Sequence, residues 1–393
     1  MRGVAHEMDM RHIGLNLLLP AVAVMWVAAA CVNDQPSFSP GQQTKPVNPF
    51  CEEAISTLDD ARPGAAAFVL IEGGEVACEH FRSNGRHIDR DTVFSTASFS
   101  KWITALGVMR LVELGRVDLD APVSRYVSRW KLPESVHDND LVTVRRLLSH
   151  TAGLTDGLGF GDYRAEEILP SLEESLENPR ASNGRKAVIA VGQEPGKVFL
   201  YSGGGYLILQ LMIEEVSGQP FEAFIDSAIL TPLGMERSSF KYIGDIANTS
   251  GSFDKEGKPA PQFQYAAAGA TAFSSSARDL TRLARALAAA DASAPISGAS
   301  VARMREPEAK VGALPIWGLG TILYAQTTGG EHVFGHDGAN DPAINVSVRI
   351  NPENGHALIV LVSGHPSLAT DLGARWVLAE TGKPDIFTLM RRR

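Results

Sequence analysis

The sequence lacks the patterns that would place it in several common classes of protein. Apart from Arg391, Arg392 and Arg393 at its end, the basic residues form no cluster, and the formal net charge is −9, so nucleic acid is not an expected partner. There is no His-Glu-x-x-His motif, and the ten histidines are scattered, so the sequence predicts no metal site. Gly-x-Ser-x-Gly is also missing, which disfavours a nucleophile elbow. No internal repeat is found, and nothing calls for a cofactor.

Charge is likewise missing from residues 13–30, which are nearly all apolar and end in three alanines before Cys31. This pattern is typical of a secretory signal, and we predict that residues 1–30 form one. Small residues before a cysteine resemble the lipobox of bacterial lipoproteins, so we expect an exported, periplasmic protein that a lipid on Cys31 anchors to the membrane. Ordinary secretion and a retained membrane helix stay open, because the segment is close to the ~20 residues that a span needs.

Cysteine is scarce, with three in 393 residues. Residues 31–48 are rich in proline, glutamine and serine without periodicity, which predicts a flexible tether. Only Cys51 and Cys78 remain after it. In an exported protein they can pair, and a disulfide closing a loop of this length would stabilise the fold by about 3 kcal/mol. The alternative is two buried free thiols.

Strand patterns occur at both ends of the chain, and helical patterns lie between them. A helix is expected at 50–60 and two strands at 65–71 and 75–81, whereas strands are expected late at 317–325, 332–338, 343–350 and 356–364 before a helix at 368–381. This order predicts an α+β (α/β sandwich) domain over residues 49–393. One antiparallel sheet, from residues 49–100 and 300–393, would be flanked by helices, with a mostly helical insertion at about 101–299.

One stretch, residues 94–115, combines a polar pair with a long apolar helix. Ser98 and Lys101 are three residues apart, so a helix places them on one face. A serine hydroxyl needs a base to become a good nucleophile, and an amine in an apolar pocket can serve because burial lowers the pKa of amines. The same spacing recurs at Ser128/Lys131, Ser238/Lys241 and Ser252/Lys255. Only Ser98 opens a long apolar helix, and this context favours it.

Two further features could complete a site with this pair. Tyr201 precedes Ser202 and three glycines, which permit a tight turn that holds the phenol at a cleft wall. Near a lysine, a phenol can act as the base or as a proton shuttle. His336 and Gly338 alternate with Asp337 in a late strand, so they share a face. A substrate carbonyl could lie there, and a main-chain N–H beside Gly338 could form an oxyanion hole with that of Ser98.

Ser-x-x-Lys opening a helix, Tyr-Ser-Gly about a hundred residues later and His-x-Gly in a late strand together resemble the serine β-lactamase-related hydrolases. That group includes class C β-lactamases, D-amino-acid peptidases with a penicillin-binding fold and esterases with a β-lactamase-like fold. Supporting stretches, among them LVELGRVDLDAPV, VTVRRLLSHTAGL and GHDGANDPAINVSVRINPENG, extend the resemblance over residues 50–380. A tyrosine in the second motif, where other branches have Ser-Asp-Asn, points to the class C-like branch.

The resemblance implies a β-lactamase/transpeptidase-like fold and a role for each matching residue. Ser98 is implied to be the acylated nucleophile, and Lys101 and Tyr201 the proton-transfer pair. His336 and Gly338 are implied to line the substrate-facing strand, with the N–H groups of Ser98 and Ala339 as oxyanion donors.

The sequence departs from the family at two of these positions. Gly203 stands where an asparagine usually contacts the substrate's amide group, and His336 stands where many members have lysine. A histidine of ordinary pKa (about 6.5) is mostly neutral at pH 7. Both changes weaken recognition of an anionic amide substrate.

The sequence therefore favours a serine hydrolase that works through an acyl-enzyme on a small ester, amide or peptide. Because an esterase needs neither the missing amide contact nor a fixed cation, it is the first expectation. The alternatives are a β-lactamase or D,D-peptidase, and a non-catalytic envelope protein that binds cell-wall peptides.

Overall fold

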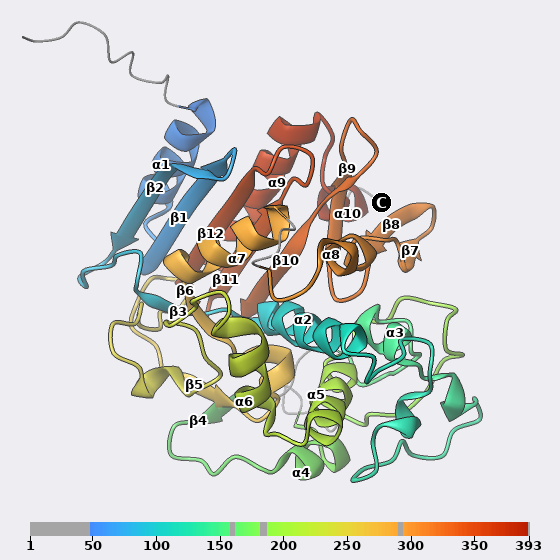
Figure 1. Ribbon diagram of the computed structural model, residues 1–393. Coiled ribbons are helices and arrows are strands. Elements are labelled where there is room, and N and C mark those ends of the chain that lie inside the picture. The colour runs from blue at the N-terminus through green and yellow to red at the C-terminus, as the bar shows by residue number, and fades with distance from the viewer. Residues whose placement is uncertain (1–47, 158–161, 181–186, 290–293, 392–393) are drawn as a thin grey trace, which may run out of the picture. The chain divides into compact units, whose positions relative to one another are not determined.

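The computed structural model describes residues 48–157, 162–180, 187–289 and 294–391 (Figure 1). The predicted signal sequence, Cys31 and all of the predicted tether except Asn48 lie outside these residues. Within the described ranges, no helix combines the length and the apolar character needed to cross a membrane.

Strands from the two ends of the chain form one sheet. In the order β2-β1-β12-β11-β10-β9-β8-β7, every neighbouring pair is antiparallel. The strands are β1 (Ala65–Glu72), β2 (Glu75–Ser83), β7 (Ala309–Val311), β8 (Leu314–Trp317), β9 (Ile322–Gln326), β10 (His332–Asn340), β11 (Ile344–Ile350) and β12 (Ala357–Ser363). The early hairpin joins the late strands where β1 pairs with β12.

Each face of this sheet packs on its own layer of helices, because side chains alternate along the strands. On β1, Val69 and Ile71 enter the same apolar core as helix α7 (Ala277–Ala289). Phe68 and Leu70 point the other way, into a second core shared with α1 (Pro49–Ala61) and α9 (Leu368–Thr381). The predicted antiparallel sheet flanked by helices is thus confirmed.

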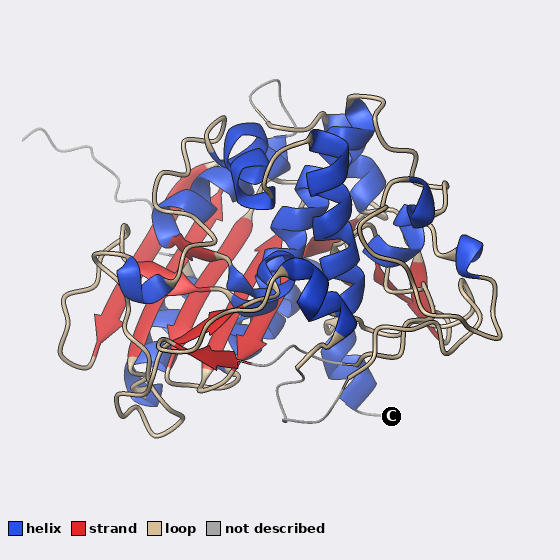
Figure 2. Cartoon of the chain, turned by 90° about the horizontal axis from the view of Figure 1, so that it is seen from below, coloured by secondary structure: helices blue, strands red, loops and turns tan. Residues whose placement is uncertain are grey.

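In the middle of the chain, helices joined by long loops pack beside the sheet (Figure 2). The longer helices are α2 (Ser100–Glu113) and α5 (Gly204–Ser217), and the shorter ones are α3 (Val144–Leu148), α4 (Leu172–Glu177), α6 (Phe221–Ile225) and α8 (Gly298–Met304). Two small ribbons pair β3 (Val93–Ser95) with β6 (Ser274–Ser276), and β4 (Asp162–Arg164) with β5 (Phe263–Tyr265). Helix α2 is buried on nearly all sides, as its apolar sequence requires.

The expectation of one strand over residues 317–325 is wrong, because the chain turns between β8 and β9. Gly320 has a φ of 68°, a conformation that favours glycine. A Cβ atom there would lie 2.3 Å from the Cβ of Ala105 in α2. The close approach of this turn to α2 breaks the strand, and a period-two pattern cannot reveal such a contact.

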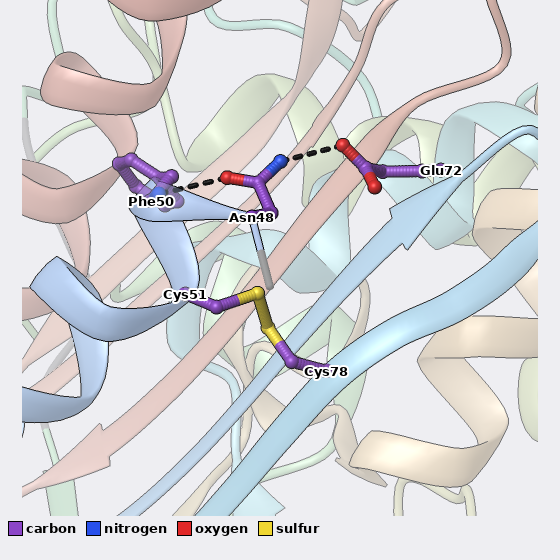
Figure 3. Close-up of a disulfide and its surroundings, with 5 residues drawn as sticks. All are labelled: Asn48, Phe50, Cys51, Glu72 and Cys78. Carbon is purple, nitrogen blue, oxygen red and sulfur yellow. Dashed lines mark hydrogen bonds between the residues drawn. A yellow bond between two sulfur atoms is a disulfide. The ribbon is translucent and has the colours of Figure 1, made fainter. Parts of the chain in front are cut away.

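A disulfide joins Cys51 in α1 to Cys78 in β2 (Figure 3). Next to it, the Asn48 side chain caps α1 by accepting from the N–H of Phe50 at 2.7 Å, and it donates to Glu72 Oε1 at 2.5 Å. These links attach the first helix to the edge of the sheet.

Candidate active site

Ser98 lies in a short 3₁₀ turn, Ala97–Phe99, between β3 and α2. Its side chain is half-buried. The residue before it, Ala97, is buried at a φ of 49°, a strained conformation of the kind found at functional sites. Hydrogen bonds fix the turn: the N–H of Thr96 donates to the Phe273 carbonyl at 3.0 Å, and the N–H of Phe273 donates to Ser100 Oγ at 2.9 Å.

Lys101 is buried in the first turn of α2, with 2% of its surface exposed. Its Nζ donates to the carbonyl of Ala270 at 2.8 Å and to Ser98 Oγ at 3.3 Å. Ala270 belongs to a π-helical turn, Ala268–Ala272, which packs against α2. The lysines of the other three Ser-x-x-Lys pairs, Lys131, Lys241 and Lys255, are exposed. Among these four lysines, Lys101 is the one that its apolar helix buries, as the sequence predicts.

Tyr201 comes from a segment a hundred residues later, yet its ring lies beside the lysine. Lys101 Nζ is 5.0 Å from the centre of the Tyr201 ring and 5.8 Å from that of Tyr206. Both distances are in the range of cation–π contacts. Since Nζ also reaches Ser98 Oγ, the serine hydroxyl lies less than a nanometre from the centre of the Tyr201 ring.

The turn that carries Tyr201 is held by a buried carboxylate. Asp156 accepts from Ser202 Oγ at 2.6 Å and from the N–H of Gly204, the first residue of α5, at 2.8 Å. Burial raises the pKa of Asp156, although these hydrogen bonds favour its charged form. A Cβ atom on Gly204 would lie 2.6 Å from Ile189. This glycine is therefore required by packing.

Aromatic rings also pack against Tyr201. The His150 imidazole stacks on the phenol ring, with centroids 4.3 Å apart and an interplanar angle of 28°. Trp317 of β8 packs edge-on against both rings, at 4.8 Å from His150 and 5.8 Å from Tyr201. Lys101, Tyr201, His150 and Trp317 therefore form one cluster from four separate segments.

His336 lies in β10 as a buried side chain, with 1% of its surface exposed. Its ring packs edge-on against Trp317 at 5.4 Å and Phe99 at 6.5 Å, and its Nδ1 is 2.5 Å from the Asp337 carbonyl. Burial, together with the charge of Lys101, lowers the pKa of His336 to about 3. The sequence places the His336 imidazole on a substrate-facing strand. In the structure the ring is neutral and buried, because Trp317 packs over it.

Gly338 brings β10 against the turn that carries Ser98. A Cβ atom at this position would lie 2.0 Å from the carbonyl oxygen of Thr96 and 3.3 Å from the nitrogen of Phe99. Only glycine allows this approach of two backbones. The next residue, Ala339, is exposed. It is paired with Asn345 of β11.

Behind β10, Asp337 points away from His336 into a buried ionic network. Arg349 of β11 forms ion pairs with Asp337 at 3.3 Å and Asp385 at 2.9 Å, with 1% of its own side chain exposed. Its guanidinium also lies 3.9 Å from the ring centre of Tyr324. This network links β9, β10, β11 and the segment before helix α10 (Ile386–Arg391).

Ser98, Lys101 and Tyr201, which the sequence predicts as site residues, lie together in the structure. The sequence did not predict the places of His150, Asp156 and Trp317 beside them. The stretch HTAGL was visible, but His150 gains its position from a φ of 56° and a ring stack with a segment fifty residues later. Among the described residues, no three histidine, cysteine, aspartate or glutamate side chains gather as metal ligands.

The family model named Beta-lactamase matches residues 51–383 of the chain. The chain belongs to this family. Its members with the β-lactamase fold are serine hydrolases, and the antiparallel sheet flanked by helices is the fold of its structural neighbours.

Individual relatives differ in how much of the chain they match. Penicillin-binding protein 4 of Amycolatopsis lactamdurans is 28% identical in an alignment 360 residues long, which covers 83% of this chain and 88% of the relative. Esterase EstB of Burkholderia gladioli is 30% identical in an alignment 205 residues long, which covers 47% of this chain and 48% of the esterase. The octameric penicillin-binding protein homologue from Pyrococcus abyssi superimposes with a TM-score of 0.68 at 27% identity, covering 87% of this chain and 80% of that one. The match thus spans only about half the length of the esterase.

Proposed function

We propose that the protein is a serine hydrolase that works through an acyl-enzyme, and most simply a carboxylesterase with the β-lactamase fold. The contacts of Lys101 are the observation that carries the proposal. A buried amine that lies 3.3 Å from Ser98 Oγ, and against the face of the Tyr201 ring, is placed for proton transfer.

In the proposed reaction, Ser98 Oγ attacks the carbonyl carbon and its proton passes to Lys101 or Tyr201. The N–H groups of Ser98 and Ala339 donate to the oxyanion, which such donors stabilise strongly in a site with little water. The leaving alcohol or amine then takes the proton, and the acyl group stays on Ser98. Water attacks this ester, the same pair moves the proton, and the acid departs.

Two features support a neutral ester over an anionic amide as the substrate. His336 is buried and its pKa is lowered to about 3, so it offers no positive charge to a substrate carboxylate at neutral pH. Gly203 has no side chain that could bond an amide group of the substrate. Neither feature touches the Ser98–Lys101 contact.

A second candidate is a β-lactamase or D,D-peptidase acting on β-lactams or cell-wall peptides. It is supported by the similarity to Penicillin-binding protein 4, which extends over 83% of this chain. A non-catalytic envelope protein that binds cell-wall peptides is the third reading. Substrate tests can separate all three.

The decisive experiment is covalent labelling followed by parallel assays. A fluorophosphonate probe is expected to label the wild type and Ser252→Ala, but not Ser98→Ala. Ser252 is a matched control, because it has the same spacing to a lysine, Lys255, that is exposed. Short-chain nitrophenyl esters, a chromogenic cephalosporin and a D-Ala-D-Ala peptide are then compared, and the esters are expected to turn over fastest.

Each other outcome rejects a definite part of the proposal. Equal labelling of Ser98→Ala, or no label on the wild type, would reject the serine-hydrolase mechanism and favour the binding protein. Turnover of the peptide or cephalosporin without the esters would reject the esterase and favour the second candidate.

A further inference from the structure

His150 occupies a turn that the proposed mechanism does not use directly. It follows α3 at a φ of 56° and is 2% exposed. Such a conformation is uncommon for residues other than glycine, although asparagine, aspartate and histidine adopt it more often than the rest, and here contacts with the neighbouring segment hold it. The carbonyl of His150 accepts from the N–H of Leu200 at 2.8 Å. The segment that carries Tyr201 is therefore docked on this turn.

The side chain makes two further contacts with that segment. Nδ1 of His150 accepts from the N–H of Ser202 at 3.1 Å, which places the proton of the neutral imidazole on Nε2. The ring face lies on the Tyr201 ring at 4.3 Å. One side chain thus holds both the backbone after Tyr201 and the phenol itself.

The ring that His150 covers is also the ring against which Lys101 lies. The charged and titratable groups around the imidazole are Lys101, Tyr201, Tyr206 and His336. Burial lowers the pKa of His150 well below its ordinary value, and the charge of Lys101 adds to this. The imidazole is therefore neutral and does not repel the lysine. Because its Nδ1 lone pair is engaged by Ser202, it is also not placed to act as a base.

We propose that His150 is a positioning residue, whose ring holds the Tyr201 phenol in place for proton transfer with Lys101 and Ser98. This inference rests on the proposed hydrolase function. A residue that only filled space would affect stability, whereas a residue that orients the phenol affects the chemical step. An error of about 1 Å in the position of such a group costs on the order of a hundredfold in rate.

Two substitutions separate the ring from the hydrogen bond. Asparagine tolerates a positive φ, and its amide oxygen can accept from Ser202, but His150→Asn removes the stacked ring. Conversely, His150→Phe keeps a ring and loses the acceptor. His87→Asn is the matched control, because His87 is exposed.

The kinetic test measures kcat and KM for a nitrophenyl ester, with folding checked by circular dichroism. His150→Asn is expected to lower kcat about a hundredfold with little change in KM. His150→Phe is expected to stay within about tenfold of the wild type, since one hydrogen bond is lost. An unchanged kcat in folded His150→Asn would overturn the proposal. So would a hundredfold loss in folded His150→Phe, which keeps the test valid if the asparagine variant does not fold.

A second measurement does not depend on hydrolysis. The protein is labelled with 3-fluorotyrosine, and Tyr201→Phe assigns one of the seven tyrosine signals. In His150→Asn the fluorine resonance of Tyr201 is expected to shift and broaden, because the ring current and the restraint of the imidazole are lost. In His87→Asn it stays in place. An unchanged Tyr201 signal in His150→Asn overturns the positioning role, whereas a wild type inert toward every substrate overturns only the proposed function.

Discussion

The buried imidazole of His336 makes the stability of the folded protein depend on pH. Burial disfavours its protonated form and lowers its pKa to about 3, whereas an unfolded chain has a value of about 6.5. The folded state therefore binds fewer protons than the unfolded state in this range. It follows that the contribution of His336 to stability is complete above pH 6.5 and is lost as the pH falls toward 3.

We predict that His336→Asn flattens this acid dependence. Between pH 7 and pH 4 the wild type should lose about 3 kcal/mol of its free energy of unfolding through this group, and the variant should not. Urea unfolding at several pH values measures the difference. His87→Asn, which changes an exposed histidine, should follow the wild type. Parallel curves for the wild type and His336→Asn would contradict the prediction.

At the scale of residues, prediction from sequence succeeded where the local pattern determines the environment. The apolar helix after Ser98 buries Lys101, while Lys131, Lys241 and Lys255 are exposed. It failed where the environment comes from distant segments. Alternation placed His336 on the face opposite Asp337, but it could not show that Trp317, from another strand, covers the ring.

At the scale of elements, the N-terminus of α5 connects fold stability to the site. Asp156 accepts from the N–H of Gly204 and from Ser202 Oγ, and a negative charge is favourable at this end of a helix. The adjacent residue, Tyr201, belongs to the same turn. The carboxylate therefore caps a helix and holds Ser202, the residue next to Tyr201.

We predict that Asp156→Ala lowers both stability and turnover. Leaving two buried donors without an acceptor should cost about 1–3 kcal/mol in the free energy of unfolding, and the loosened turn should reduce kcat. Ser297→Ala is a suitable control, because Ser297 caps α8 by accepting from the N–H of Ser300 at 3.2 Å. Its loss should cost about 1 kcal/mol and leave kcat unchanged. Thermal unfolding and ester kinetics of both variants test this, and equal kcat values would argue against the role of Asp156.

Helix and strand positions were largely predictable, but the reason for a charged residue in an apolar strand was not. Arg349 lies in β11 among apolar neighbours, and α9 makes room for it at Gly373, where a Cβ atom would lie 2.5 Å from Arg349 Nε. Its partners, Asp337 and Asp385, come from other elements. A buried pair of this kind depends on contacts that no local pattern contains.

At the scale of the whole sheet, the early and late strands meet where β1 pairs with β12, and the site lies two strands beyond β12, at β10. Strand patterns at both ends made this closure predictable. The disulfide at the opposite edge, on β2, accords with our proposal that the protein is exported, because disulfides persist in oxidising compartments. The sheet therefore places the disulfide away from the proposed catalytic residues.

We predict that removing the disulfide weakens the fold without changing catalysis. Cys51 and Cys78 are 27 residues apart in sequence, and opening a loop of this size should lower the free energy of unfolding by about 3 kcal/mol. In Cys51→Ala/Cys78→Ala, kcat and KM for an ester should match the wild type at temperatures where both are folded, since β1, β12 and β11 lie between β2 and β10. Dithiothreitol should destabilise the wild type and leave the double variant unaffected. A change in kcat of the folded wild type on reduction would contradict the prediction, because it would mean that the edge of the sheet is coupled to the site.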